Sequence, residues 1–138
     1  MFAAFTRQLL LLCAAVLLLA AAPGAQALTK CNGTIEVLGH SLRLVPHDNA
    51  QVTVKAKYAA PDTKPDRIVV VSANAQVHHS RDGEKRTTNF QLLYQFQPNA
   101  PRVAEDAKRV DVRWCSVKEP CQIDKIEFNN VSCTEYGK

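Results

Sequence analysis

The residues of this chain whose types and spacing allow specific chemistry are cysteines, paired histidines and clustered basic side chains. Four cysteines follow a predicted export signal described below: Cys31, Cys115, Cys121 and Cys133. An even number of cysteines in a short exported chain predicts disulfide bonds. Zinc binding is not expected, because no C-x2-C pair occurs and the histidines lie far from the cysteines in the sequence.

Four cysteines allow three pairings, and spacing alone does not select one of them. We favour Cys31–Cys133 with Cys115–Cys121. The first bond would join the two ends of the domain, and a closed loop of that length is worth about 4–5 kcal/mol in the chain-entropy model. The second would brace a tight hairpin around Pro120. Cys31–Cys115 with Cys121–Cys133 remains an open alternative.

The pair His78-His79 is interpreted as two histidines near the end of a strand. Neighbouring residues on a strand point to opposite faces, so regular strand geometry does not let both rings chelate one metal. The serine hydrolase motif G-x-S-x-G is absent, and five glycines form no phosphate-binding loop. We therefore expect a protein that is not an enzyme, with no catalytic residue, cofactor or metal.

Basic residues recur in three groups along the chain. The third is Arg102, Lys108 and Arg109, and the first two supply the candidate binding surface. Lys55 and Lys57 share the outward face of one strand, and Arg81, Lys85 and Arg86 flank a predicted Asp-Gly turn. If the groups converge in space, these five residues form a candidate binding surface for an extracellular protein or glycan. The alternative is a solvated face whose lysines suppress edge-to-edge pairing of sheets.

Residues 1–27 have the features of a secretory signal peptide. Arg7 provides a basic start, the run from Leu9 to Ala22 is apolar, and Ala25-Gln26-Ala27 is a small-x-small cleavage site. The apolar run is about 14 residues, shorter than the roughly 20 of a spanning helix. We therefore expect Cys13 to leave with the signal, and residues 28–138 to form one domain that is secreted, lies in the secretory lumen or, in a bacterium, in the periplasm.

Removing the signal peptide leaves 138 − 27 = 111 residues and a mildly basic charge. Loss of Arg7 reduces the 17 basic residues to 16, against 13 acidic ones, so the net charge is about +3. No concentrated basic face is evident, so nucleic acid is not an expected partner. No transmembrane segment is expected after cleavage.

Two sequons lie beside cysteines: Asn32-Gly33-Thr34 and Asn130-Val131-Ser132. In a eukaryotic secretory pathway, Asn32 and Asn130 are candidate glycosylation sites on exposed chain.

Apolar and polar residues alternate with period two through most of the mature sequence, which is typical of half-buried strands. Residues 68–71 are apolar on both faces, which predicts a central strand. The expected strands are 34–38, 41–45, 51–59, 67–78, 87–97, 109–115 and 122–129. About seven strands predict an all-β fold, a single antiparallel β-sandwich cross-linked by disulfides, with a small β-barrel as the alternative.

Three segments are expected to lie outside these strands. Residues 61–66 contain two prolines and are predicted to form a loop. Residues 103–108 form the one helix-like stretch, and residues 134–138 are expected to be frayed.

The segment Cys115–Lys125, C-S-V-K-E-P-C-Q-I-D-K, resembles the cysteine–proline–cysteine segment of the MD-2-related lipid-recognition domains. Those domains are secreted sandwiches of this size. The resemblance covers eleven residues near the carboxyl end, whereas in that family the segment lies near the amino end, and it assigns no binding residue here.

These features predict a secreted, non-catalytic recognition or accessory domain that binds a protein or a glycan. One alternative is a carrier of an apolar ligand, such as a lipid, in a cavity between the sheets, lined by Phe90, Tyr94 and Trp114. Another is an inhibitor of a secreted enzyme, which would present the loop at 62–66 or the hairpin at 80–86.

Overall fold

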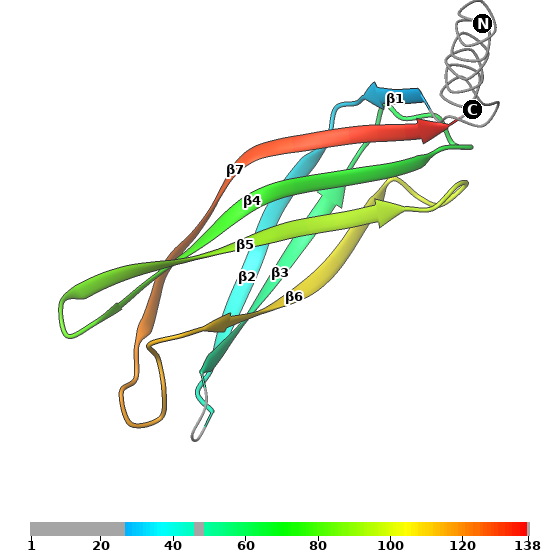
Figure 1. Cartoon of the computed structure of the whole chain (residues 1–138). Coiled ribbons are helices and arrows are strands. Elements are labelled where there is room, and N and C mark those ends of the chain that lie inside the picture. The colour runs from blue at the N-terminus through cyan, green and yellow to red at the C-terminus, as the bar shows by residue number, and fades with distance from the viewer. Residues whose placement is uncertain (1–26, 46–48, 138) are drawn as a thin grey trace, which may run out of the picture.

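The computed structural model describes residues 27–45 and 49–137, and the predicted signal peptide therefore lies outside the described residues except for Ala27. The described chain forms two antiparallel sheets that pack as a sandwich (Figure 1). The four-stranded sheet has the order β1-β7-β4-β5 and the three-stranded sheet the order β2-β3-β6. The strands are β1 (Ala27–Lys30), β2 (Thr34–Arg43), β3 (Ala50–Ala59), β4 (Ile68–Arg81), β5 (Glu84–Phe96), β6 (Val103–Val112) and β7 (Gln122–Gly137). The two sheets have separate ladders, so the fold is the predicted sandwich and not a closed barrel.

The core lies between β3 and β4, the central strands of the two sheets. Alternate residues of each strand point inward, as a period of two requires. The inward residues of β3 are all buried, from Ala50 to Tyr58, and so are those of β4 from Val69 to Val77. Each valine buried in this way contributes about 1.5–3 kcal/mol of transfer free energy. The predicted central position of residues 68–71 is confirmed.

The prediction of two short strands at 34–38 and 41–45 is wrong, because β2 is one continuous strand. Val37 pairs with Ala56 and Gly39 pairs with Lys55, so Leu38 is an extra residue opposite the β3 ladder. Such a bulge bends a strand without ending its pairing. The bend that the sequence predicts around Gly39 is therefore a β-bulge within one strand, and not a boundary between two strands.

The predicted helix at 103–108 is also wrong, because this segment belongs to β6. Ten consecutive pairs join β6 to β3, from Ala59↔Val103 to Ala50↔Val112. Ala, Glu and Lys are good helix formers, but such preferences amount to less than about 1 kcal/mol per residue, and pairing with a buried central strand outweighs them.

The prediction that residues 134–138 are frayed is wrong as far as residue 137. Residues 134–137 continue β7, and Tyr136 pairs with Leu28 of β1 on one side and Ile68 of β4 on the other. The end of the chain is therefore held between two strands as far as Gly137.

Two disulfides join the cysteine pairs that the sequence favoured. Cys31 and Cys133 connect the beginning and the end of the described chain, with an S–S distance of 1.96 Å. Cys115 and Cys121 close a short loop between β6 and β7, with an S–S distance of 2.00 Å. Within residues 27–45 and 49–137, no helix is long and apolar enough to cross a membrane.

Candidate functional site

The candidate site lies where the β4–β5 hairpin meets the loop closed by Cys115 and Cys121, and we call this region the hairpin end. It comprises residues 78–88 and 114–127. The hairpin turns at Asp82 and Gly83, whose φ angles are 51° and 79°. Positive φ at both central residues is the signature of a type I′ turn, which an Asp-Gly pair favours. The tight turn fixes the register, so Arg81 faces Glu84 and His79 faces Arg86.

Trp114 is held in an unusual backbone conformation at the start of the disulfide loop. Its φ is 84°, in the left-handed region that bulky residues rarely adopt. The backbone is fixed on both sides of this residue: Arg81 Nη1 donates to Trp114 O at 2.6 Å, and Ala50 N donates to Cys115 O at 3.0 Å. A residue in such a conformation costs about 1–3 kcal/mol and persists only where its surroundings determine it.

Two arginines from the hairpin stack on the indole of Trp114. The guanidinium carbon of Arg81 lies 4.2 Å from the ring centroid, and that of Arg86 lies 4.5 Å from it. Arg81 also contacts Glu119 at 3.1 Å, and Arg86 contacts Glu84 at 3.1 Å. Cation–π contacts and carboxylate pairing together fix the planes of both guanidinium groups.

His79 lies beneath this stack and is almost fully buried, with 2% of its surface exposed. Its Nε2 is 3.0 Å from Thr88 Oγ1, and its Nδ1 is 3.9 Å from Cys115 Sγ. Burial lowers the pKa of His79, and nearby Arg86 and His78 lower it further against the opposing effect of Asp124. The ring is therefore neutral at pH 7. The predicted opposite orientation of the two histidines is confirmed, because His78 bonds Glu127 on the outer face.

The donor atoms of His79, Cys115 and Cys121 all lie within 4.8 Å of one another. Three such side chains resemble part of a zinc site, which requires thiolate sulfurs. The two sulfurs are joined to each other here, so neither is a thiolate. The cluster acts as packing under the hairpin.

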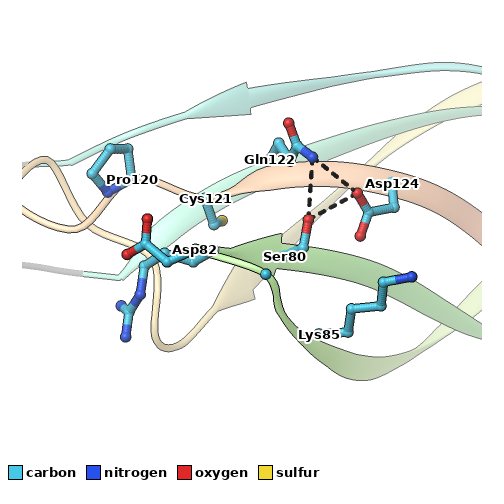
Figure 2. A pocket seen from close by; sticks show the side chains of 9 residues that line it. Ser80, Asp82, Lys85, Pro120, Cys121, Gln122 and Asp124 are labelled. Atoms are coloured by element: carbon cyan, nitrogen blue, oxygen red, sulfur yellow. Dashed lines mark hydrogen bonds between the residues drawn. The ribbon is translucent and has the colours of Figure 1, made fainter.

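The outer face of the hairpin end carries a hollow of about 630 Å³ that is open to solvent. Figure 2 shows a hydrogen-bonded group on its floor, in which Ser80 Oγ donates to Asp124 Oδ1 at 2.9 Å and Gln122 Nε2 donates to Ser80 Oγ at 3.3 Å. Lys85 lines this hollow and also a second one of about 310 Å³, beside His78 and Lys125.

Charges of both signs line the second hollow, the acid being Asp124, and Glu127 bonds two of its lining residues. Glu127 accepts hydrogen bonds from Lys125 at 2.9 Å and from His78 at 2.8 Å. The bond from Lys125 is the larger cause that lowers the pKa of Glu127, and the bond from His78 adds to it. This carboxyl group therefore stays ionised and offsets the basic side chains around it.

The structure divides the predicted binding surface into two parts. Arg81, Lys85 and Arg86 lie together at the hairpin end, whereas Lys55 and Lys57 lie on β3 in the other sheet. Lys55 is 3.3 Å from Glu105, and Lys57 stands between Glu36 and Glu105 in the strand register. Lys55 is thus paired with an acid, and Lys57 has acidic residues beside it on both neighbouring strands.

Sequence reasoning missed the contact of Trp114 with the arginines. Trp114 was expected to point between the sheets, but it lies at the end of the sandwich. The Asp-Gly turn could have placed Arg81 and Arg86 on one face, since a two-residue turn fixes the register. The partner ring comes from the other sheet, and no local signal predicts that contact.

Asn32 and Asn130, the two sequon asparagines, are both exposed. Asn32 lies in the connection between β1 and β2, and Asn130 lies at the bulge in β7 with a φ of 55°. Neither side chain is packed into the core.

No protein-family model, no curated protein and no solved structure matches this chain.

Proposed function

We propose that this protein is a secreted, non-catalytic recognition module that binds an extracellular protein through its hairpin end. The observation that carries the proposal is the stack of Arg81 and Arg86 on Trp114, whose backbone is held at a φ of 84°. Local strain and fixed guanidinium planes are typical of surfaces prepared for binding, because pre-organisation lowers the entropy lost when a partner docks.

The residue types at the hairpin end favour a protein partner. Tryptophan and arginine are the residues most enriched in the energetic centres of protein interfaces. Val117, in the loop closed by Cys115 and Cys121, is 51% exposed, and the side chain of Arg86 is also 51% exposed. The hairpin end therefore offers apolar and bidentate polar contacts together. Such a mixture matches the anatomy of a protein interface.

The charges of the hairpin end are balanced, which makes a polyanionic glycan a poorer fit. The basic residues are Arg81, Lys85, Arg86, Lys118 and Lys125, and the acidic residues are Asp82, Glu84, Glu119, Asp124 and Glu127. Binding of a polyanion needs an excess of positive charge over a continuous surface. A partner with charges of both signs is therefore favoured over a sulfated or uronic glycan.

Export of the protein is part of this proposal. The two disulfides support it, because such bonds persist in oxidising compartments. The exposed sequon asparagines Asn32 and Asn130 lie outside the hairpin end, so glycans attached there would leave the proposed binding surface open.

The alternative that the protein carries an apolar ligand between its sheets is not supported by the packing of the aromatic side chains on β5. Tyr94 packs against Phe96 and Tyr58, with ring centroids 4.8 Å and 5.1 Å apart. Leu92, on the same face of β5, has no exposed surface, so no water-sized space adjoins it. The inhibitor alternative is a special case of the proposal, since the hairpin at 80–86 would be its presenting element.

Site-specific photo-crosslinking tests the proposal. A photoreactive residue at Val117 is expected to capture an extracellular protein, and the same probe at Ser41, on the exposed face of β2, is expected to capture none. Trp114→Ala should weaken binding of the captured protein at least about tenfold, and Lys55→Ala should leave it unchanged. Equal capture at both positions, or salt-sensitive binding to sulfated glycans alone, would overturn the protein assignment.

A further inference from the structure

β5 is a long edge strand whose outer side has no partner among the residues that the structure describes. It pairs with β4 through thirteen consecutive residues, from Arg81↔Glu84 to Val69↔Phe96, without a register shift. On its other side the four-stranded sheet ends. Figure 1 shows β5 as the border of that sheet along its whole length. Edge strands of this length present a row of unpaired backbone groups.

The type I′ turn determines which backbone groups of β5 are unpaired. In a two-residue hairpin the residues that flank the turn exchange hydrogen bonds, and hydrogen-bonded pairs then alternate along the ladder. Arg81 and Glu84 are the flanking residues, so the even-numbered residues of β5 bond β4. The odd-numbered residues direct N–H and C=O groups outward, and these are Lys85, Thr87, Asn89, Gln91, Leu93 and Gln95. Their side chains are exposed as well.

The other edges of the sandwich are protected in ways that β5 is not. β6 carries five charged residues in ten, namely Glu105, Asp106, Lys108, Arg109 and Asp111. β2 contains the bulge at Leu38. β1, the other edge of the four-stranded sheet, is only four residues long, and the part of β7 that β1 leaves uncovered carries Asp124, Lys125 and Glu127. Charges and bulges of this kind prevent edge-to-edge pairing. Residues 87–96 of β5 contain no charge, no proline and no bulge.

The sequence of β5 is complementary to itself in the antiparallel direction. Two copies of β5 can be paired antiparallel about a twofold axis at Gln91. Asn89 of one copy then faces Leu93 of the other, and Thr87 faces Gln95. Each residue whose backbone groups point outward therefore meets another such residue. On the inner face, Phe90 faces Leu92 and Thr88 faces Tyr94. No pair within residues 87–95 places charges opposite each other. A twofold interface requires this kind of self-complementary patch.

We propose that two copies of this chain associate through β5, which pairs antiparallel with itself about Gln91 to form one continuous eight-stranded sheet. The pairing satisfies the outward N–H and C=O groups of β5 and covers Leu93, which is 51% exposed in the single chain. Antiparallel pairing places the two hairpin ends at opposite ends of the joined sheet. The dimer would thus present two binding sites that face away from each other, although the dimer itself does not depend on the proposed binding function.

Sedimentation velocity of the purified, disulfide-bonded protein tests the association. The wild-type chain is expected to be a dimer that dissociates on dilution. Gln91→Lys places two ammonium groups opposite each other at the axis and should raise the dimer dissociation constant at least about tenfold. Ser41→Lys, on the edge strand β2, is the matched control and should leave the dimer intact.

Mixing two variants of opposite charge shows whether a variant is monomeric because of charge repulsion or because it has lost its fold. Gln91→Lys and Gln91→Glu should each be monomeric, and an equimolar mixture of the two should form a heterodimer. Gln91→Cys should give an inter-chain disulfide on oxidation, because the two residues face each other across the axis. Gln95→Cys should not, since residue 95 faces Thr87. A wild-type chain that stays monomeric at about 100 µM, or a dimer that Gln91→Lys leaves unchanged, would overturn the proposal.

Discussion

At the scale of single residues, close packing around the terminal disulfide leaves no room for a side chain at position 33. A Cβ atom added to Gly33 would lie 2.8 Å from Cys133 Cβ and 3.1 Å from both methyl carbons of Val71. Backbone and disulfide fix these neighbours, so they cannot move aside cheaply. Glycine is therefore required here for close approach.

The variant Gly33→Ala should lower the free energy of unfolding by about 1–3 kcal/mol, the usual effect of overpacking a core position. Denaturant unfolding followed by circular dichroism measures the loss. Gly39→Ala is the matched control, because nothing lies within 4 Å of a Cβ atom added there. Equal stability of the two variants would contradict the argument.

His79 should make the stability of the fold depend on pH. Burial lowers its pKa in the folded protein, while in the unfolded chain the group titrates near about 6.5. The unfolded state then binds more protons between the two pKa values. Stability is fully present above the unfolded pKa and is lost as the pH falls through the folded pKa.

Unfolding by urea at pH 7, 6 and 5 should therefore give a free energy of unfolding that decreases toward pH 5. His79→Phe should reduce this slope, whereas a substitution of the exposed His40 to Gln should preserve it. A wild-type slope that His79→Phe does not change would assign the effect to other groups.

At the scale of elements, Arg81 joins the hairpin to the disulfide loop through three kinds of contact. Arg81 donates to the carbonyl of Trp114, pairs with Glu119 and stacks on the indole. These contacts join β4 to the segment that follows β6, which belongs to the opposite sheet. The side chain of Arg81 is only 18% exposed, so solvent screens the contacts weakly.

Arg81→Ala should lower the free energy of unfolding by about 1–2 kcal/mol. It should also shift the tryptophan emission to longer wavelength, because Trp114 is the one tryptophan of the chain and would become more hydrated. Arg109→Ala, on the exposed face of β6, should change neither quantity. An unchanged emission spectrum in Arg81→Ala would show that the stack does not form in solution.

At the scale of the whole molecule, the two disulfides are expected to differ in their contribution to stability. Cys31–Cys133 spans 102 residues and Cys115–Cys121 spans 6. In the chain-entropy model these loops correspond to about 5 and about 2 kcal/mol. The long-range bond therefore contributes more to holding the sandwich together, and the short-range bond shapes the loop at the hairpin end.

Double alanine variants of each pair test this difference. Cys31→Ala with Cys133→Ala should lower the thermal midpoint more than Cys115→Ala with Cys121→Ala. The second double variant should instead weaken the proposed partner binding. The opposite order of thermal midpoints would show that the short loop carries more of the fold than its length indicates.

The sequence alone predicted the sandwich, because alternation with period two is a local consequence of strands that bury one face. The alternating residues Val52 to Tyr58 and the apolar run at 68–71 placed the core correctly. The errors at 103–108 and 134–137 arose where pairing with a distant strand overrode local preference. Local composition does not report such long-range pairing.

The sequence by itself determined most of the strands and the hairpin turn, since each depends on neighbouring residues, and it placed four cysteines within residues 28–138. Only the tertiary structure decided that Arg81 and Arg86 meet Trp114 and that Lys55 and Lys57 do not join them. It also decided that, within residues 27–45 and 49–137, the outer side of β5 has no partner strand. These facts depend on how two sheets pack and on which strand lies at an edge. The physical reason is that burial and backbone pairing between segments distant in the sequence select among locally equivalent arrangements.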